Sequence, residues 1–425
     1  MSETSTRWLI VTGCFTSELT GPVLFAATFS VFFATLLNSE PWSRTAIAFA
    51  YSLYVVVYGL SGPLVGRWCE RFGPKRVMMA GGISIAGGFA LLGITRQAWQ
   101  FCLVYGLLGV TAGMTGIVPL TTLVFRWFVA NPGLGIGVAS SGTLGGLFLA
   151  PLAHVLIEQL GWRGAYPVLG GGAGLLLFGV ILATVEDAPL SAVQVNELEG
   201  SASGSLQPFA QGTSDQSISD DLSLRQALAT QRFWLLAASG FLFLGALAAL
   251  LAHAVPLAQD RGMAGGTAAL ALGLIVGLGP IGRVGLGHLA DRYQAKAILV
   301  VSFLIQAAAL FLLLSNQGVR FFWAFVVIFA IGHGGALAVA PVVIGDLFGR
   351  TSLASLVGAY WLVATAGSVV GPPLAAAVRQ DVGSYYPVLT VFAVSMLCAA
   401  GLTGMIREQT SPVGRPLFVS THRTT

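Results

Sequence analysis

The sequence predicts an all-α membrane protein with twelve transmembrane helices in two pseudo-symmetric six-helix bundles. Three observations support this fold class: very few charged residues, twelve long apolar runs, and related motifs in the two halves. Asp, Glu, Lys and Arg make up only 9% of the 425 residues, whereas hydrophobic residues make up 55%. Soluble domains carry about 25% charged residues, so this composition excludes a cytosolic enzyme, a nucleic-acid-binding protein and a disordered chain.

Twelve runs free of Asp, Glu, Lys and Arg are each long enough to cross a bilayer. The hydrocarbon layer is about 30 Å thick, and a helix needs about 20 apolar residues to span it. Strands of membrane barrels are about ten residues long and alternate in polarity, so these longer, uniformly apolar runs favour helices. The runs are 19–39, 45–66, 77–95, 97–125, 127–157, 164–185, 233–259, 262–282, 297–319, 321–345, 351–378 and 382–406.

The distribution of Lys and Arg predicts the orientation of the chain. With a cytoplasmic N-terminus, 14 basic residues lie inside and six outside, which agrees with the positive-inside rule. The first seven residues are polar and the first apolar run is too long for a signal peptide, so none is expected. We therefore expect both termini to be cytoplasmic. Short loops on both sides favour a bacterial inner membrane.

One polar segment divides the chain into two parts. Residues 187–221 are rich in Ser, Gly and acidic residues, which is typical of a flexible linker. A short surface helix is expected over 222–232. The expected organisation is a first bundle over 1–186, a linker over 187–232, a second bundle over 233–408 and a cytoplasmic tail over 409–425.

The two halves contain related sequences about 221 residues apart. The segment 66–75 follows the second apolar run, and the related segment 287–296 follows the eighth. Two similar six-helix bundles in one chain predict a pseudo-twofold axis along the membrane normal. Such an architecture supports alternating access, in which one half rocks against the other.

The first of these segments resembles the cytoplasmic-loop signature of the major facilitator superfamily. The resemblance extends over about residues 8–408 and implies a gate in which the acid latches the inside-closed state by pairing with bases on neighbouring helices. Ordinary positive-inside anchoring is the alternative interpretation. The residues of this gating motif are Gly66, Glu70, Arg71, Gly73, Lys75 and Arg76 in the first half, and Asp291 and Arg292 in the second.

Within that superfamily, the sequence resembles the monocarboxylate-porter and oxalate/formate-exchanger branch. The segments 41–46 and 161–166 carry this resemblance, together with Arg283 in the eighth run. It implies that an arginine in helix 8 holds the substrate carboxylate. Dicarboxylate exchangers of this branch have a second base in helix 11, and 363–367 contains none, so one carboxylate is expected.

Arg283 is the strongest functional candidate. It lies eight residues before Asp291, which places it about 12 Å deep in the membrane. A guanidinium at that depth costs at least about 2.5–3.5 kcal/mol, so it is expected to face a watery cavity and an anion. Its planar fork suits a carboxylate bidentately. A purely structural ion pair with Glu18 is the alternative.

Three titratable residues within apolar runs are candidates for proton coupling. Glu18 in the first run is either a proton carrier or a packed acid near the inner end. His253 and His333 are candidates for a proton relay, although such histidines are more often only hydrogen-bonded structure. His333 is also a candidate substrate ligand because glycines flank it.

Aromatic residues are candidates for shaping the substrate cavity. Tyr51, Tyr54 and Tyr58 share one helical face, and Tyr360 and Trp361 lie in the eleventh run. Of these, Tyr54, Tyr360 and Trp361 are the predicted substrate-binding residues. Helix packing or an interfacial belt is the alternative for each.

The sequence contains no motif for a nucleotide, cofactor or metal, so the energy is expected to come from an ion gradient. The resulting prediction is a monomeric, non-enzymatic secondary transporter that moves a lactate-like monocarboxylate with a proton. Its expected partners are a small organic anion, a proton and the lipid bilayer, without nucleic acid. The alternatives are an efflux antiporter for drugs or other metabolites, and a carboxylate sensor on a transporter fold that does not transport.

Overall fold

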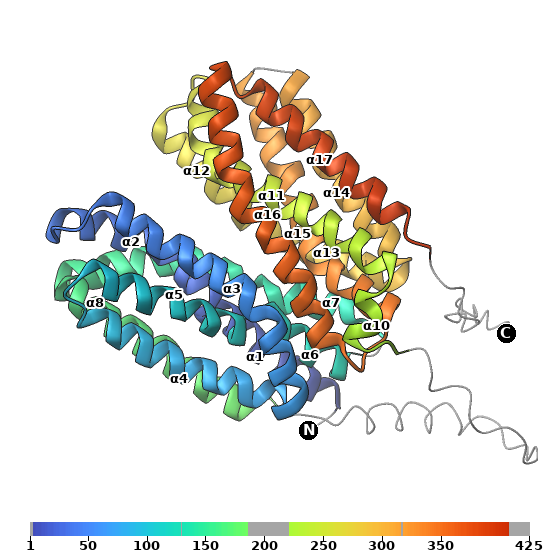
Figure 1. Ribbon diagram of the computed structural model, residues 1–425, viewed down its shortest axis with the longest axis horizontal. Helices are drawn as coiled ribbons and strands as arrows, with labels where there is room; N and C mark the ends of the chain where they lie inside the picture. The colour runs from blue at the N-terminus through green and yellow to red at the C-terminus, as the bar shows by residue number, and fades with distance from the viewer. Residues whose placement is uncertain (1–2, 129, 186–220, 316–317, 408–425) are drawn as a thin grey trace, which may run out of the picture.

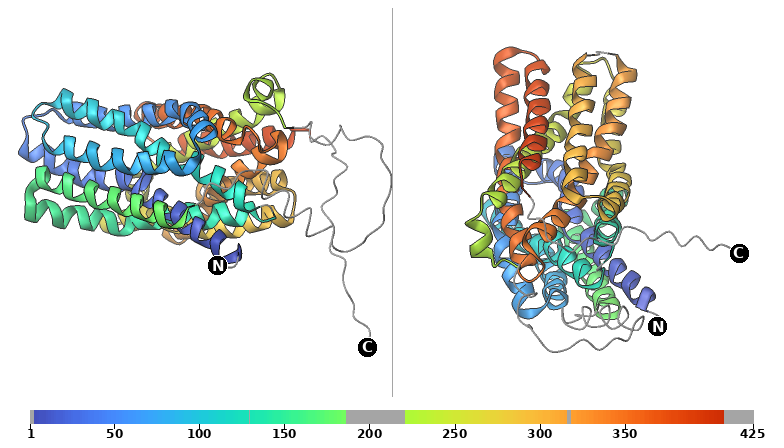
Figure 2. Two further views of the ribbon diagram at one scale, coloured as in Figure 1. Left: turned by 90° about the horizontal axis from the view of Figure 1, so that it is seen from below. Right: turned by 90° about the vertical axis from the view of Figure 1, so that its right-hand side faces the viewer.

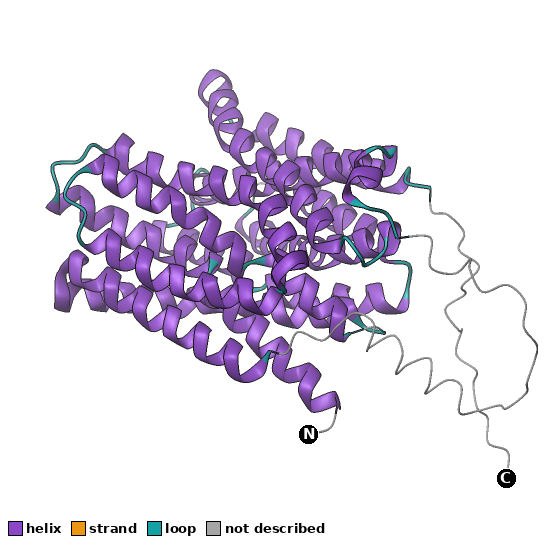
Figure 3. Cartoon of the chain, turned by 60° about the horizontal axis from the view of Figure 1, so that its bottom comes forward, coloured by secondary structure: helices purple, strands orange, loops and turns teal. Residues whose placement is uncertain are grey.

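The computed structural model describes residues 3–128, 130–185, 221–315 and 318–407. Within these ranges the regular structure is entirely helical, and short loops connect the helices (Figure 3). The predicted linker over 187–232 is described only from residue 221 onward, and the predicted tail over 409–425 lies outside the described residues.

The described part of the first half contains eight α-helices and one 3₁₀ helix. They are α1 (Glu3–Thr20), α2 (Pro22–Ser39), α3 (Arg44–Phe72), α4 (Pro74–Gly93), α5 (Ala98–Thr115), α6 (Ile117–Trp127), α7 (Pro132–Ser140), η1 (Ser141–Gly145) and α8 (Gly146–Thr184). Some crossings consist of two successive helices, because the helix is interrupted inside the membrane. Examples are α1 with α2, and α5 with α6.

The second half begins with a short helix in the segment where a surface helix is predicted. Seven longer helices follow, of which α12 and α13 together make one crossing. The elements are α10 (Leu224–Leu228), α11 (Gln231–Gln259), α12 (Gly265–Gly277), α13 (Gly279–Arg292), α14 (Ala295–Ser315), α15 (Val319–Phe348), α16 (Leu353–Val382) and α17 (Tyr386–Gly404).

Eleven stretches of the described chain are long and apolar enough to cross a membrane. One of them, Pro132–Thr184, is 53 residues long. It contains Gly161, whose backbone is not helical (φ 66°, ψ 167°). At about 1.5 Å per residue this stretch is far longer than a bilayer is thick, so it holds two crossings and the total is twelve. The predicted fold class is thereby confirmed.

The first crossing starts earlier than the sequence predicts. Helix α1 begins at Glu3 and continues through α2 to Ser39, whereas the apolar run begins only at residue 19. The hydroxyls of Thr12, Thr16 and Thr20 donate to carbonyls four residues back, so these polar side chains are satisfied within the helix. Glu18 therefore lies in the middle of a 35-residue stretch, not near its inner end.

The two halves meet at one end of the molecule and diverge toward the other. Figure 1 shows the blue-green half and the yellow-red half side by side near the chain termini and apart toward α2 and α12. In the right-hand view of Figure 2 the long helices of the second half run alongside one another. We refer to the end where the halves meet as the closed end, and to the other as the open end.

Glycines allow the helices of the two halves to touch at the closed end. A Cβ atom on Gly62 of α3 would lie only 2.6 Å from the carbonyl oxygen of Gly358 in α16. Gly133 of α7 and Gly287 of α13 approach each other in the same way. At these glycines the halves therefore meet backbone against backbone, along α3–α16 and along α7–α13. A side chain crosses between α6 and α15, where the Phe125 ring lies against Gly345.

Candidate functional site

Four membrane crossings are interrupted deep in the molecule. The breaks lie at Gly21 between α1 and α2, at Gly116 between α5 and α6, at 141–145 between α7 and α8, and at Leu278 between α12 and α13. Proline, which has no N–H to donate, follows three of these breaks within three residues, as Pro22, Pro119 and Pro280. Interrupted helices are typical of the binding sites of secondary transporters, because they free backbone polar groups.

The first two breaks lie against each other. Pro119 cannot donate to the carbonyl of Thr115, and the Ser17 hydroxyl donates to that oxygen instead, at 2.7 Å. Gly21 lies against the Thr115 side chain with no room for a Cβ atom. Similarly, Pro22 leaves the carbonyl of Glu18 without its usual helical donor.

Arg283 extends from the second half to the break in the first. One of its terminal nitrogens, Nη1, donates to the carbonyl of Ser140, the last residue of α7. The chain changes from α-helix to 3₁₀ helix at this point, and the Ser140 carbonyl also accepts from the Thr143 hydroxyl at 3.4 Å, so side chains help to satisfy this oxygen. At Gly137 the backbone of α7 lies directly against the backbone of Arg283.

The guanidinium of Arg283 is buried and only partly paired. The residue is 8% exposed, and its Nε has no hydrogen-bond partner. None of the ion pairs between described residues involves Arg283. A charge buried in apolar surroundings costs free energy until it is paired. The guanidinium of Arg283 can therefore still accept an anionic partner through Nε.

Glu18 lies close to Arg283 without forming an ion pair with it. Their charges interact through space. The Oε2 atom of Glu18 is buried and has no hydrogen-bond partner. Gly142 packs against the Cβ atom of Glu18, since a Cβ on that glycine would lie 3.0 Å from it. Arg283 and Glu18 thus face one region from opposite halves.

His333 on α15 lies beside this site. The residue is 4% exposed, and its Nδ1 lies 3.3 Å from the carbonyl oxygen of Phe329. Its Nε2 faces Gly279 at the α12–α13 break, where an added Cβ would be 3.1 Å away. Its electrostatic interaction with Arg283 places both residues in the same region.

The structure separates the three aromatic residues predicted to bind substrate. Trp361 is half-buried and lines a small cavity between the halves, together with Tyr58 and Thr365. Its Nε1 has no hydrogen-bond partner. Tyr54 is 4% exposed and stacks within the first half. Tyr360 is 2% exposed and packs against Gly240 of α11, inside the second half.

His253 lies in a different network, toward the open end of the second half. Its Nδ1 is 3.2 Å from the Tyr385 hydroxyl, and its Nε2 is 3.4 Å from the Pro372 carbonyl oxygen. Nearby, Arg379 pairs with Asp260 at 3.0 Å. Partial burial raises the pKa of Tyr385 above its ordinary value, so its hydroxyl stays neutral and can donate to the histidine. The structure therefore does not bring His253 to Arg283.

The acids of the gating motif contact helix N-termini in the opposite half. Glu70 accepts a hydrogen bond from the backbone N–H of Ser355, in the first turn of α16, at 3.0 Å. Asp291 accepts from the N–H groups of Gly133 and Leu134, in the first turn of α7, at 2.7 and 2.8 Å. Carboxylates are favoured at these positions because helix N-termini carry unpaired N–H groups and a positive dipole. No feature of the sequence indicates these partners.

The other residues of the gating motif have varied environments. Gly66 meets the backbone of Ala354 in α16, where an added Cβ would lie 2.5 Å from the carbonyl oxygen. Gly73 has φ 86° at the junction of α3 and α4, a conformation that favours glycine. Lys75 donates to the carbonyl of Leu182 at 3.4 Å. The remaining bases are exposed: Arg71, Arg76 and Arg292.

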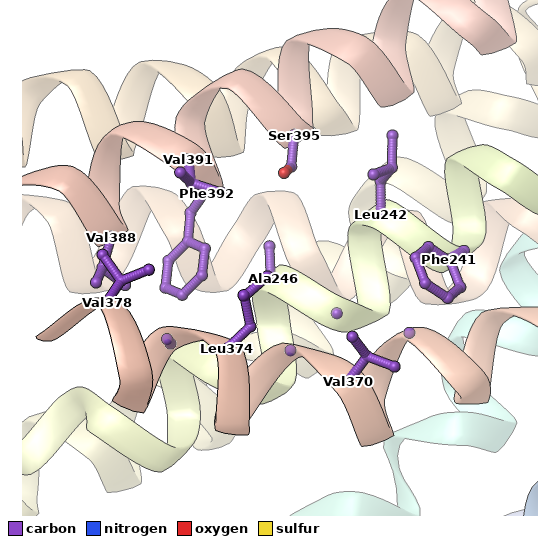
Figure 4. A pocket seen from close by; sticks show the side chains of 14 residues that line it. Phe241, Leu242, Ala246, Val370, Leu374, Val378, Val388, Val391, Phe392 and Ser395 are labelled. Atoms are coloured by element: carbon purple, nitrogen blue, oxygen red, sulfur yellow. The ribbon is translucent and has the colours of Figure 1, made fainter. Parts of the chain in front are cut away.

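A separate apolar groove lies between α11, α16 and α17 of the second half (Figure 4). Its volume is about 280 Å³. Its wall includes Leu374 and Phe392, and Ser395 is its only polar side chain. A groove without a charged side chain cannot pair a carboxylate, so it is not the anion site.

Comparison with known proteins gives a consistent result. The family model described as "Major Facilitator Superfamily" matches residues 14–295 and 281–418. Monocarboxylate transporter 12 of Mus musculus is 26% identical over 420 residues, which cover 94% of this chain and 85% of the relative. The oxalate:formate antiporter of Oxalobacter formigenes is 26% identical over 385 residues, which cover 89% of this chain and 86% of that protein.

A solved structure supports the same fold. A crystal structure of the E. coli fucose:proton symporter, FucP, superposes with a TM-score of 0.67. The match covers 95% of this chain and 99% of the symporter, at 14% sequence identity. The twelve crossings, the two diverging halves and the family match lead to one conclusion: the chain belongs to the major facilitator superfamily.

Proposed function

We propose that this transporter moves a small organic monocarboxylate across the membrane together with a proton, by alternating access. The observation that carries the proposal is the buried guanidinium of Arg283, whose Nε has no partner and whose Nη1 is held by a single backbone carbonyl. The names of the monocarboxylate transporter and the oxalate:formate antiporter among its relatives also favour a small organic anion.

Binding of the anion is coupled to the contact between the halves. A carboxylate that engages the guanidinium fork competes with the Ser140 carbonyl for Nη1. Arg283 belongs to α13 and Ser140 to α7, so this exchange replaces a contact between the halves with a contact to the substrate. Substrate binding thus changes the free energy of separating α7 from α13.

Glu18 supplies the proton site in this proposal. An ionised Glu18 repels an incoming carboxylate and competes with it for Arg283. A protonated Glu18 removes the repulsion and can donate a hydrogen bond through its unpartnered Oε2. The proton and the anion therefore favour each other's binding, which supports their movement together. His333 stays a second candidate, whereas His253 is too remote in this conformation to contact the bound anion.

Glu70 and Asp291 form the gate at the closed end, which we place on the cytoplasmic side because basic residues are concentrated there. Each carboxylate holds the first turn of a helix in the opposite half. Opening the closed end breaks both contacts. The described conformation is thus open to the outside, and we place the protein in a bacterial inner membrane.

The first prediction concerns Arg283. Replacing it by Gln should lower carboxylate affinity by roughly a hundredfold or more, because a buried charged hydrogen bond is lost. Proteoliposome uptake of labelled pyruvate and the thermal shift produced by pyruvate both measure this loss. Arg320→Gln, at an exposed residue of α15, is the matched control and should behave like the wild type. Equal uptake and equal thermal shift for Arg283→Gln would rule out the site.

The second prediction concerns Glu18. The variant Glu18→Gln cannot release a proton, so it should lose uptake driven by a pH gradient. It should keep substrate exchange between equal concentrations on the two sides. Glu158→Gln, on the exposed part of α8, is the control and should keep both activities. Persistence of gradient-driven accumulation in Glu18→Gln would show that the proton is carried elsewhere.

The third prediction concerns the gate. Cys69 is buried on the α3 face that carries Gly62 and Gly66, so its alkylation rate should report opening of the closed end. Glu70→Ala with Asp291→Ala should raise this rate by roughly tenfold to thirtyfold, since each lost cap costs about 1 kcal/mol. Cys14, Cys102 and Cys398 are replaced by serine, the last because it lies within the membrane crossing α17. An unchanged rate of Cys69 labelling, compared with the same protein that keeps Glu70 and Asp291, would contradict the gating role.

A further inference from the structure

Asp221 connects the segment before α10 to the loop between α15 and α16. Its Oδ2 atom accepts hydrogen bonds from the backbone N–H groups of Arg350 and Thr351, at 3.2 and 2.9 Å. The same oxygen also accepts from the Thr351 hydroxyl. The next residue, Leu222, donates its backbone N–H to the carbonyl of Phe348 at 2.9 Å. Two successive residues thus attach this segment to the α15–α16 loop, which consists of residues 349–352.

The conformation of the loop fits this contact. Gly349 ends α15 with φ 84°, which favours glycine, and it lies against the Asp221 carboxyl group with no room for a Cβ atom. Arg350 and Thr351 lie between the two helices, outside the regular helical hydrogen bonds, and Asp221 accepts from both of their N–H groups. The carboxyl group of Asp221 therefore holds the backbone of the loop just before α16 begins.

The same loop and the helix that follows it contact the first half. The guanidinium of Arg350 lies over the ring of Phe125 in α6, 5.4 Å from its centre. In the first turn of α16, the backbone N–H of Ser355 donates to Glu70 of α3 at 3.0 Å. Arg350, Phe125 and Glu70 also line one small cavity between the halves. The loop therefore lies between the segment that contains Asp221 and the gate.

Asp221 itself is part of the second half. The short helix α10 contacts α11 and α16, and Figure 1 shows it at the closed end. A capping box formed by Ser223 and Gln226 defines the start of α10 only two residues after Asp221. Asp221 and the loop are therefore expected to move together when the halves separate, whereas Glu70 moves with the first half.

We propose that Asp221 is a positioning residue for the gate, because it holds the loop so that the Ser355 N–H group meets Glu70. This inference rests on the gating role proposed for Glu70. Removing the Asp221 carboxyl group leaves two N–H groups and one hydroxyl of the loop without this acceptor, so the start of α16 is held less firmly against α3.

A second effect of removing Asp221 has the opposite sign. Its negative charge lies near the same helix start as Glu70, so its loss removes a repulsion between the two carboxylates. Asp221 is exposed, and charge–charge interactions at exposed sites are weak and screened by salt. The hydrogen bonds to the loop are direct contacts, so their loss decides the direction of the effect.

The test uses the full-length protein in which Cys69 is the only cysteine, and it measures the rate of Cys69 alkylation. Asp221→Ala should raise this rate by about threefold to tenfold, because the loop loses its hydrogen bonds. Asp221→Asn keeps one oxygen acceptor, and all three bonds converge on one oxygen, so its rate should stay within about twofold of the wild-type rate. Asp381→Ala removes an exposed acid at the opposite end of α16 and is the matched control, with an unchanged rate expected.

A double variant tests whether Asp221 acts through Glu70. In the protein that carries Glu70→Ala, the further change Asp221→Ala should alter the alkylation rate by less than about twofold, because the contact that Asp221 positions is already absent. Independent, multiplying effects of the two changes would show that Asp221 acts elsewhere and would overturn the inference.

The remaining outcomes separate this inference from the proposed gate. Unchanged labelling in Asp221→Ala together with faster labelling in Glu70→Ala overturns the positioning role and leaves the gate intact. Equally fast labelling in Asp221→Asn and Asp221→Ala overturns the role of the hydrogen bonds, and the proposal with it. Unchanged labelling in both Asp221→Ala and Glu70→Ala overturns the gating role of Glu70 and the inference that rests on it.

Discussion

A single guanidinium buried between two helical bundles is the constraint on which the rest of this site depends. In apolar surroundings a fixed positive charge must be neutralised by its neighbours, and arginine cannot lose its proton to avoid the cost. Here the charge is only partly met, by the carbonyl end of α7 and by the nearby acid Glu18. Because these two partners come from the first half and Arg283 from the second, every change at the guanidinium is also a change in the contact between the halves.

The broken helices follow from the same constraint. A continuous helix satisfies its own backbone and offers nothing to a polar ligand, whereas a break exposes carbonyls and N–H groups inside the membrane. Pro22 and Pro119 produce such breaks, and Ser17 satisfies one of the carbonyls that they free. The chain therefore gives up helical hydrogen bonds at the level of Arg283. These polar backbone groups lower the free-energy cost of burying the Arg283 charge, and Arg283 forms no direct ion pair with Glu18.

Much of this arrangement can be predicted from the sequence, and the exceptions have a common cause. Runs without charged residues identify the twelve crossings, and counting residues from Asp291 places Arg283 deep in the membrane. The start of α1 escapes prediction because threonine hydroxyls bond within their own helix and do not need water. The Ser140 contact, the helix N-termini that meet Glu70 and Asp291, and the remote position of His253 all depend on which helix faces which. A single sequence does not contain that pairing, although proline four residues after Glu18 is a visible sign of a break.

The closed end is built so that its contacts can be broken without leaving large defects. Glycine backbones lie against each other along α3–α16 and α7–α13, so few side chains interlock there, although the buried Phe125 ring of α6 packs on Gly345 and under Arg350 of the second half. The polar contacts are carboxylates on helix N-termini, and both groups can bind water once they part. The situation at Arg283 is the reverse. When this buried guanidinium loses its carbonyl partner inside the membrane, no water is present to take the place of the carbonyl. A ligand or a water-filled cavity must then pair the charge. In the proposed cycle the larger cost of separating the halves therefore lies at the guanidinium and not at the gate, and an anion that satisfies Arg283 in place of Ser140 lowers that cost.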